Sequence, residues 1–129
     1  MEAEALRILI VDDEEELVSA VEERLNLRGF QAHGVTTGAA ALEYLADKPC
    51  DVVLLDVKMP GLGGLEVIKR IKEEHPGLEV ILLTGHGSAQ DADRGMQLGA
   101  FDYVMKPVKI DVLVRLLLSA AERKDKGDI

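Results

Sequence analysis

The sequence lacks the features of a secreted or membrane-spanning protein. Among its 129 residues there is one cysteine, Cys50, so no disulfide can form within the chain. No apolar run approaches the roughly 20 residues needed to cross a bilayer. The acidic start, residues 1–7, is unlike a signal peptide. We therefore expect a cytoplasmic protein that does not associate with membranes.

Aromatic residues and positive charge are also scarce. Aromatics make up 3% of the chain, and the net charge is −9 at pH 7. Direct binding to nucleic acid is disfavoured, because that task uses clustered Lys and Arg and aromatic stacking surfaces. For a chain with this net charge, a divalent cation is a more plausible binding partner than nucleic acid. Apolar residues are plentiful, at 47%, which is enough for one domain with its own core.

Short apolar runs alternate five times with amphipathic stretches. The runs predict strands at residues 8–11, 30–35, 52–55, 80–83 and 103–105. The strand at 30–35 is less apolar than the others and is expected near an edge of the sheet. Apolar strands separated by helices indicate an α/β fold with a parallel sheet, covered on both faces by right-handed crossovers.

The stretches between the strands carry helix signals. The first helix should end at Gly29, the second is capped by Thr37, the third stops before Pro76, and the fourth is capped by Ser88 and ends at Gly99. The last helix has two sets of apolar residues. We expect core positions at Val112, Leu113, Leu116 and Leu117, and outward positions at Val114 and Leu118.

Polar residues follow the predicted central strands at the point where each strand ends. They are Asp12, Asp13, Asp56, Thr84 and Lys106. The carboxyl ends of parallel strands lie along one edge of a sheet, and ligands bind there at the point where strand order reverses. These five residues, distant in sequence, are therefore predicted to meet in one crevice.

The chemistry of this set suits a phosphoryl group. Two carboxylates 4 Å apart repel by about 4 kcal/mol at an effective dielectric near 20, so such a cluster favours a bound cation. Mg²⁺ takes carboxylate oxygens readily. A metal and Lys106 would offset charge on transferring oxygens, while one carboxylate acts as nucleophile.

Each residue also has an ordinary reading when taken alone. The Asp12–Asp13 pair could be an acidic helix start favoured by the helix dipole. Asp56 could initiate a turn, Thr84 could be a cap, and Lys106 could be a solvated surface residue. The functional prediction depends on their joint placement at strand ends.

The motifs at these positions resemble the receiver domain of bacterial two-component response regulators. They are Val11–Asp13, Leu55–Gly61, Leu83–Gly85, and Gly99–Tyr103 leading into Lys106–Pro107. The resemblance implies a flavodoxin-like, doubly wound, five-stranded parallel sheet of order 2-1-3-4-5 with five helices on both faces. It also implies a receiver at residues 7–123, an N-terminal extension at 1–6 and a tail or linker at 124–129.

The resemblance assigns the acidic residues. Asp56 would be the phosphoacceptor, supplied by a histidine kinase, a phosphotransfer protein or a small phosphodonor. Asp12, Asp13, Asp56 and the backbone carbonyl of Lys58 would hold Mg²⁺ or Mn²⁺. The domain would promote its own phosphorylation and dephosphorylation without turning over an external substrate.

The resemblance also assigns a switch. Thr84 and Lys106 would contact the phosphoryl oxygens, and Tyr103 would rotate inward when Thr84 moves. Lys58 and His86 would flank the entrance and tune the lifetime of the acyl phosphate. The Lys106–Pro107 peptide is often cis in this family.

The implied output is a change of surface on the fourth helix, fifth strand and fifth helix. That surface would control an output domain or protein, or form a phosphorylation-dependent homodimer. The segment Leu83–Pro107 is similar to receivers attached to transcriptional activators with an ATPase domain.

Three other functions remain as alternatives. The first is a degenerate receiver that binds partners without phosphorylation. The second is a Mg²⁺-dependent aspartyl phosphohydrolase, but that class needs an Asp where this chain has Lys58. The third is a flavin module, but the acidic run Asp12–Glu16 would repel its phosphate.

Overall fold

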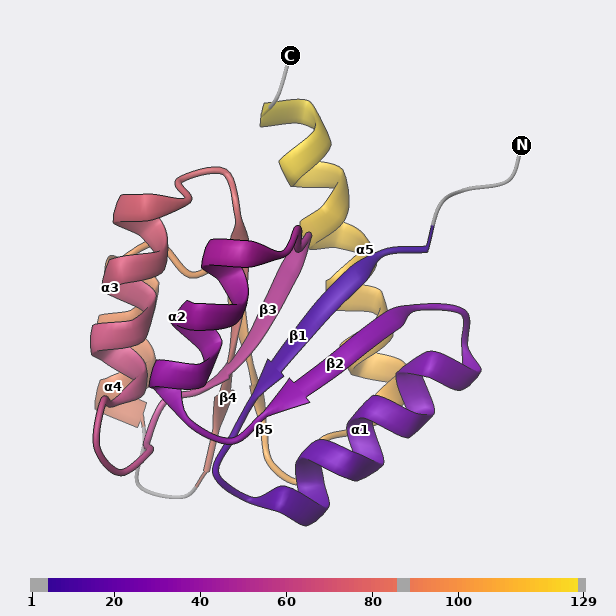
Figure 1. Ribbon diagram of the computed structural model, residues 1–129, viewed down its shortest axis with the longest axis horizontal. Coiled ribbons are helices and arrows are strands. Elements are labelled where there is room, and N and C mark those ends of the chain that lie inside the picture. The colour runs from indigo at the N-terminus through magenta and orange to yellow at the C-terminus, as the bar shows by residue number, and fades with distance from the viewer. Residues whose placement is uncertain (1–4, 86–88, 128–129) are drawn as a thin grey trace.

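A computed structural model describes residues 5–85 and 89–127 (Figure 1). In chain order the elements are β1 (Arg7–Val11), α1 (Glu15–Leu27), β2 (Gln31–Val35), α2 (Gly38–Asp47), β3 (Val52–Asp56), α3 (Gly64–Glu74), β4 (Glu79–Thr84), α4 (Ala89–Gln97), β5 (Asp102–Met105) and α5 (Ile110–Gly127). All neighbouring strands are parallel, in the order β2-β1-β3-β4-β5. The predicted fold class and strand order are confirmed, with β2 at an edge.

The sheet is buried on both faces. Helices α2, α3 and α4 cover one face, and α1 and α5 cover the other (Figure 1). Within β3, Val53 and Leu55 pack towards α2 and α3, whereas Val52 and Leu54 pack towards α1 and α5. A strand with both faces covered must be apolar at every position, which explains the uninterrupted run. Each such side chain contributes about 1.5–3 kcal/mol through burial.

Two helix signals act as predicted. The first turn of α2 is capped by Thr37, whose hydroxyl oxygen accepts a hydrogen bond from Ala40 N at 3.0 Å. After α1, Gly29 has a φ of 94°, a conformation that favours glycine. Helix α4 begins at Ala89, and the proposed cap Ser88 lies outside the described residues.

The assignment of α5 faces needs correction. Leu113, Leu117 and Ala120 are fully buried, and Leu118 points outward as expected. Val112, however, is 44% exposed, so its predicted core position is wrong. Val114, predicted to point outward, is partly buried against the core. The buried stripe follows the i, i+4, i+7 spacing, and Val112 is one residue out of that phase.

The outer edge of β2 is closed by side chains of α1. The Asn26 amide donates to Ala32 O at 3.2 Å and accepts from Ala32 N at 2.8 Å, while Glu22 Oε2 accepts from Gly34 N at 2.9 Å. Helix α1 lies so close that a Cβ at Gly34 would be 2.1 Å from Val18 Cγ1. Side-chain caps of this kind satisfy backbone groups that an edge strand otherwise exposes.

Among the described residues, none of the helices combines the length and the apolar character that a membrane span requires. The Lys106–Pro107 peptide is cis, as the resemblance suggested.

Candidate functional site

The ends of four strands bring the predicted site together. Asp12 directly follows β1, Asp56 ends β3, Thr84 ends β4, and Lys106 directly follows β5. The strand registers align these ends, since Val11 pairs with Leu55 in the neighbouring strand. The crevice lies where strand order reverses between β1 and β3, at the carboxyl edge of the sheet.

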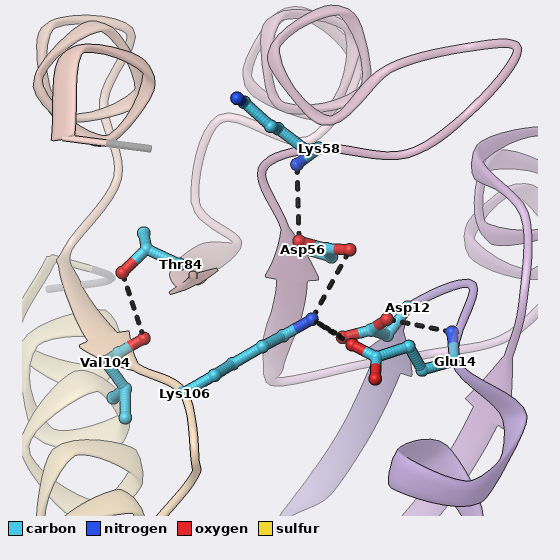
Figure 2. A network of polar contacts seen from close by, with 7 residues as sticks. All are labelled: Asp12, Glu14, Asp56, Lys58, Thr84, Val104 and Lys106. Carbon is cyan, nitrogen blue, oxygen red and sulfur yellow. Dashed lines mark hydrogen bonds and ion pairs between the residues drawn. The ribbon is translucent and has the colours of Figure 1, made fainter. Parts of the chain in front are cut away.

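Lys106 is the centre of the polar contacts. Its Nζ lies 2.7 Å from Asp12 Oδ2, 2.8 Å from Glu14 Oε1 and 3.6 Å from Asp56 Oδ2. Figure 2 shows the lysine reaching across from the end of β5 towards these carboxylates. The Lys106 ammonium thus connects the end of β5 to the ends of β1 and β3.

Three carboxylates form a cluster at this edge. Asp12 and Asp56 are buried and Asp13 is exposed, and oxygens of all three lie within 4.8 Å of one another. Asp12 Oδ1 accepts a hydrogen bond from Glu14 N at 3.0 Å. Asp12 Oδ2 is buried and its contact with Lys106 is an ion pair outside hydrogen-bond geometry, so it accepts no hydrogen bond from the described residues.

The electrostatics of the site follow from this crowding. Burial, followed by the charge of Asp12, raises the pKa of Asp56 to about 6, although Lys106 and the Lys58 N–H act in the opposite direction. Burial alone would lower the pKa of Lys106. Its contacts with Asp12 and Glu14 and the charge of Asp56 outweigh burial and raise that pKa. Asp56 is therefore largely ionised at pH 7, and Lys106 stays charged.

The loop after β3 also contacts Asp56. Lys58 donates its backbone N–H to Asp56 Oδ1 at 3.2 Å, and its side chain extends away from that carboxylate (Figure 2). His86, the other residue expected at the entrance, lies outside the described residues.

Thr84 and Tyr103 lie on the other side of the crevice. The Thr84 hydroxyl donates to Val104 O at 3.4 Å and so is directed away from Asp56 (Figure 2). Beside it is a cavity of about 200 Å³ lined by residues of β4, α4 and β5, including Thr84, Ala92 and Tyr103. Tyr103 is 45% exposed. The cavity provides space next to Thr84 that a side chain can enter.

Glu14 is a site residue that the strand-end pattern does not predict. In the sequence it stands out only as a member of the acidic run Asp12–Glu16, yet its carboxylate contacts Lys106, 92 residues further along the chain. The signal in the sequence is weak, since Glu14 only follows the acidic pair directly. The structure adds that Glu14 occupies the N-cap position of α1 without a side-chain capping bond.

Fold and site together define an α/β domain with a carboxylate–lysine centre at the carboxyl edge of its sheet. The family model for the response regulator receiver domain matches residues 8–118. The chain belongs to this family. The match disfavours the phosphohydrolase and flavin alternatives.

Relatives with this domain are longer proteins. The chain is 41% identical over 110 residues to the DNA-binding transcriptional regulator NtrC of Escherichia coli K12, covering 85% of this chain and 24% of that protein. It is 37% identical over 119 residues to a putative NtrX-like response regulator of Rickettsia conorii, covering 91% and 25%. The chain thus spans about a quarter of the length of these curated relatives.

Solved structures show the same fold. A response regulator receiver domain protein from Clostridium thermocellum superposes with a TM-score of 0.88 at 33% identity, covering 93% of this chain and 97% of that one. NtrX from Brucella abortus gives a TM-score of 0.90 at 32% identity, covering 96% of this chain and 28% of that one.

Proposed function

We propose that this domain receives a phosphoryl group on Asp56 from a histidine kinase, a phosphotransfer protein or a small phosphodonor. The observation that carries the proposal is the environment of Asp56. It is a buried carboxylate at the carboxyl edge of the sheet, beside two further aspartates and a lysine. A largely ionised carboxylate can act as a nucleophile, and the lysine can offset developing negative charge.

The transfer proceeds in two steps. A carboxylate oxygen of Asp56 attacks phosphorus, and the bond to the donor breaks, P–N in phosphohistidine or P–O in acetyl phosphate. The bonding electron pair leaves with the donor, and an acyl phosphate forms on Asp56. Water later attacks phosphorus, releases inorganic phosphate and restores the carboxylate. Each cycle uses one phosphodonor, releases one inorganic phosphate and returns the domain to its starting state. The proposed role of this cycle is signalling.

Mg²⁺ or Mn²⁺ is the proposed cofactor. The residues fit a hard cation, since Asp12, Asp13 and Asp56 offer oxygens within 4.8 Å of one another, and ligands across a Mg²⁺ octahedron lie about 4 Å apart. Asp12 Oδ2 is buried without a hydrogen bond. The Lys58 backbone carbonyl is proposed as a fourth ligand. When bound, the cation neutralises charge on the transferring oxygens.

The cavity beside Thr84 supports a proposed switch. We propose that the Thr84 hydroxyl exchanges its bond with Val104 O for a phosphoryl oxygen, and that Tyr103 then enters the space lined by Thr84 and Ala92. Lys106 would contact the phosphoryl group as well. Lys58 and His86 remain the residues proposed to tune the lifetime.

The proposed output surface is α4, β5 and α5. Apolar residues on it are exposed, including Tyr103, Met105 and Leu118. Such a group of residues suits a protein contact. We propose that it engages an output domain or protein, or a second copy of the chain after phosphorylation. The receiver would span residues 7–123, with 1–6 as an extension and 124–129 as a linker, and would act in the cytoplasm as part of a regulator like NtrC or NtrX.

Phosphorylation is tested by intact-mass measurement after incubation with acetyl phosphate and Mg²⁺. The parent should gain one phosphoryl group, and Asp56→Asn should gain none. A parent that gains nothing from acetyl phosphate or from any histidine-kinase donor would instead favour the degenerate-receiver alternative.

A further inference from the structure

We propose that Glu14 is a positioning residue for Lys106. In the resting domain it holds the lysine ammonium on the acidic side of the site and competes with the incoming phosphoryl group for it. This inference rests on the proposed phosphorylation of Asp56. It assigns a role to a residue that the predicted site did not include.

The distances show which partners hold the lysine. Nζ of Lys106 is 2.7 Å from Asp12 and 2.8 Å from Glu14, but 3.6 Å from Asp56. In Figure 2 the Glu14 carboxylate lies beside that of Asp12, and both face the tip of Lys106. To bond an oxygen on phosphorylated Asp56, the ammonium must give up one of these two carboxylates.

The two short contacts differ in burial. The Asp12 side chain is fully buried, whereas the Glu14 side chain is 61% exposed. Breaking a buried ion pair is strongly unfavourable, while an exposed pair contributes little and exchanges readily with water. Glu14 is therefore the partner that Lys106 gives up, and Asp12 is the one it keeps.

The backbone of Glu14 explains why its side chain reaches the lysine. Its N–H is bonded to Asp12 Oδ1 at 3.0 Å, which fixes the residue directly beside the site. At the N-cap of α1, Glu14 has φ −84° and ψ 100°, and its side chain forms no capping bond. The carboxylate is thus available to accept the hydrogen bond from Lys106 at 2.8 Å.

Glu14→Gln should speed the phosphorylation of Asp56 by acetyl phosphate about two- to fivefold. This range follows from the strength of an exposed ion pair expressed as a rate ratio. Rates are measured by intact mass at saturating Mg²⁺. The matched control is Glu15→Gln, which removes the same charge one residue further on. Glu15 forms no ion pair with any residue that the structure describes, so its removal reports only long-range charge.

A double-mutant cycle shows whether the effect passes through Lys106. Glu14→Gln should have no effect beyond that of Glu15→Gln when Lys106→Met is already present. An acceleration of the same size in that background would overturn the inference. If Lys106→Met accepts no phosphoryl group, the rate ratio of Glu14→Gln to the parent is measured at low and high salt. It should fall towards one as salt screens the exposed pair, and a constant ratio would overturn the inference.

The outcomes separate the two proposals. A parent that takes no phosphoryl group defeats the proposed function and this inference with it. A parent that is phosphorylated, with equal rates for Glu14→Gln and Glu15→Gln, leaves the proposed function intact and overturns the role of Glu14.

Discussion

The two ends of the sheet both hold carboxylates in or near the core, but they balance the charge differently. At the amino end, Asp51 accepts from Arg7 Nε and Nη2 at 3.1 Å each and from Arg7 N at 2.8 Å. Buried Glu79 faces two cations, with Lys72 Nζ at 3.9 Å and Arg123 Nε at 3.4 Å. At the carboxyl end, the carboxylates of Asp12, Glu14 and Asp56 share Lys106, and Asp13 lies beside Asp12 and Asp56.

The difference distinguishes an end whose ion pairs join the strands and helices from the end at which we propose phosphoryl transfer. At the amino end, each of these carboxylates faces at least one cation of its own. These ion pairs tie β1 to the start of β3, and β4 to α3 and α5. The surplus of negative charge at the carboxyl end adds to the effect of burial in raising the pKa of Asp56. This repulsion favours a bound cation, and we expect it to lower the free energy of unfolding of the cation-free domain.

The largest expected effect comes from breaking the amino end. Asp51→Ala should lower the free energy of unfolding by about 3 kcal/mol, because it removes three charge-assisted hydrogen bonds and leaves Arg7 without this partner. Urea denaturation measures the change. The control is Asp111→Ala, since Asp111 is 86% exposed and 3.8 Å from Arg28. It should cost less than about 0.5 kcal/mol, and equal losses for the two variants would contradict the comparison.

Removing a carboxylate charge from the carboxyl end should have the opposite effect on the free energy of unfolding. In metal-free buffer at pH 8, Asp56→Asn should raise the free energy of unfolding by about 2 kcal/mol. The pKa of Asp56 is about 6 in the folded domain, above the ordinary value of 3.8. The folded parent therefore takes up a proton before the unfolded chain does, and its stability rises as pH falls from about 6 to about 4. The advantage of Asp56→Asn should shrink over that window, and a gain independent of pH would refute this account.

A bound cation should offset the repulsion among the same carboxylates without any mutation. At ten times its dissociation constant, Mg²⁺ should stabilise the parent by about 1.4 kcal/mol. Asp13→Asn should reduce this gain by weakening the cation site, whereas Asp47→Asn, on α2, should leave it unchanged. Thermal unfolding with and without Mg²⁺ gives both values. Equal stabilisation of the parent and Asp13→Asn would place the cation elsewhere.

The last prediction concerns Cys50, at the amino end of the sheet, and involves no change in the stability of the domain. Burial raises the pKa of its thiol to about 12, and its Sγ lies 3.4 Å from Val52 O. The thiolate is the reactive form, so alkylation by iodoacetamide at pH 8 should be far slower in the folded domain than in urea. Thiol titration over time checks this, and equal rates would show that the amino end opens readily.

The fold, and the clustering of polar residues at the carboxyl ends of the strands, could be predicted from the sequence because both depend on local patterns. Apolar runs such as Val52–Leu55 indicate buried strands, and a polar residue after such a run marks the carboxyl edge. The roles of Asp56, Thr84 and Tyr103 in phosphorylation and switching remain predictions. They depend on events that the strand pattern alone does not encode.

Other features depend on the packed chain. The contact of Glu14 with Lys106 joins residues 92 positions apart and requires a particular side-chain direction. The exposure of Val112 depends on the rotation of α5 about its axis, which the segment Val112–Leu118, apolar except for Arg115, leaves ambiguous. The capping of Ala32 by Asn26 appears only once α1 is placed beside β2.

We propose that phosphoryl transfer takes place on Asp56, at the carboxyl end of the sheet, where carboxylates outnumber cations. The most direct measurement is to phosphorylate the parent with acetyl phosphate and Mg²⁺, reduce the acyl phosphate with borohydride, and map the resulting homoserine by peptide mass spectrometry. We predict homoserine at position 56 and nowhere else. Homoserine at Asp12, Asp13 or Asp51, or none under conditions that modify a known receiver, would contradict the claim.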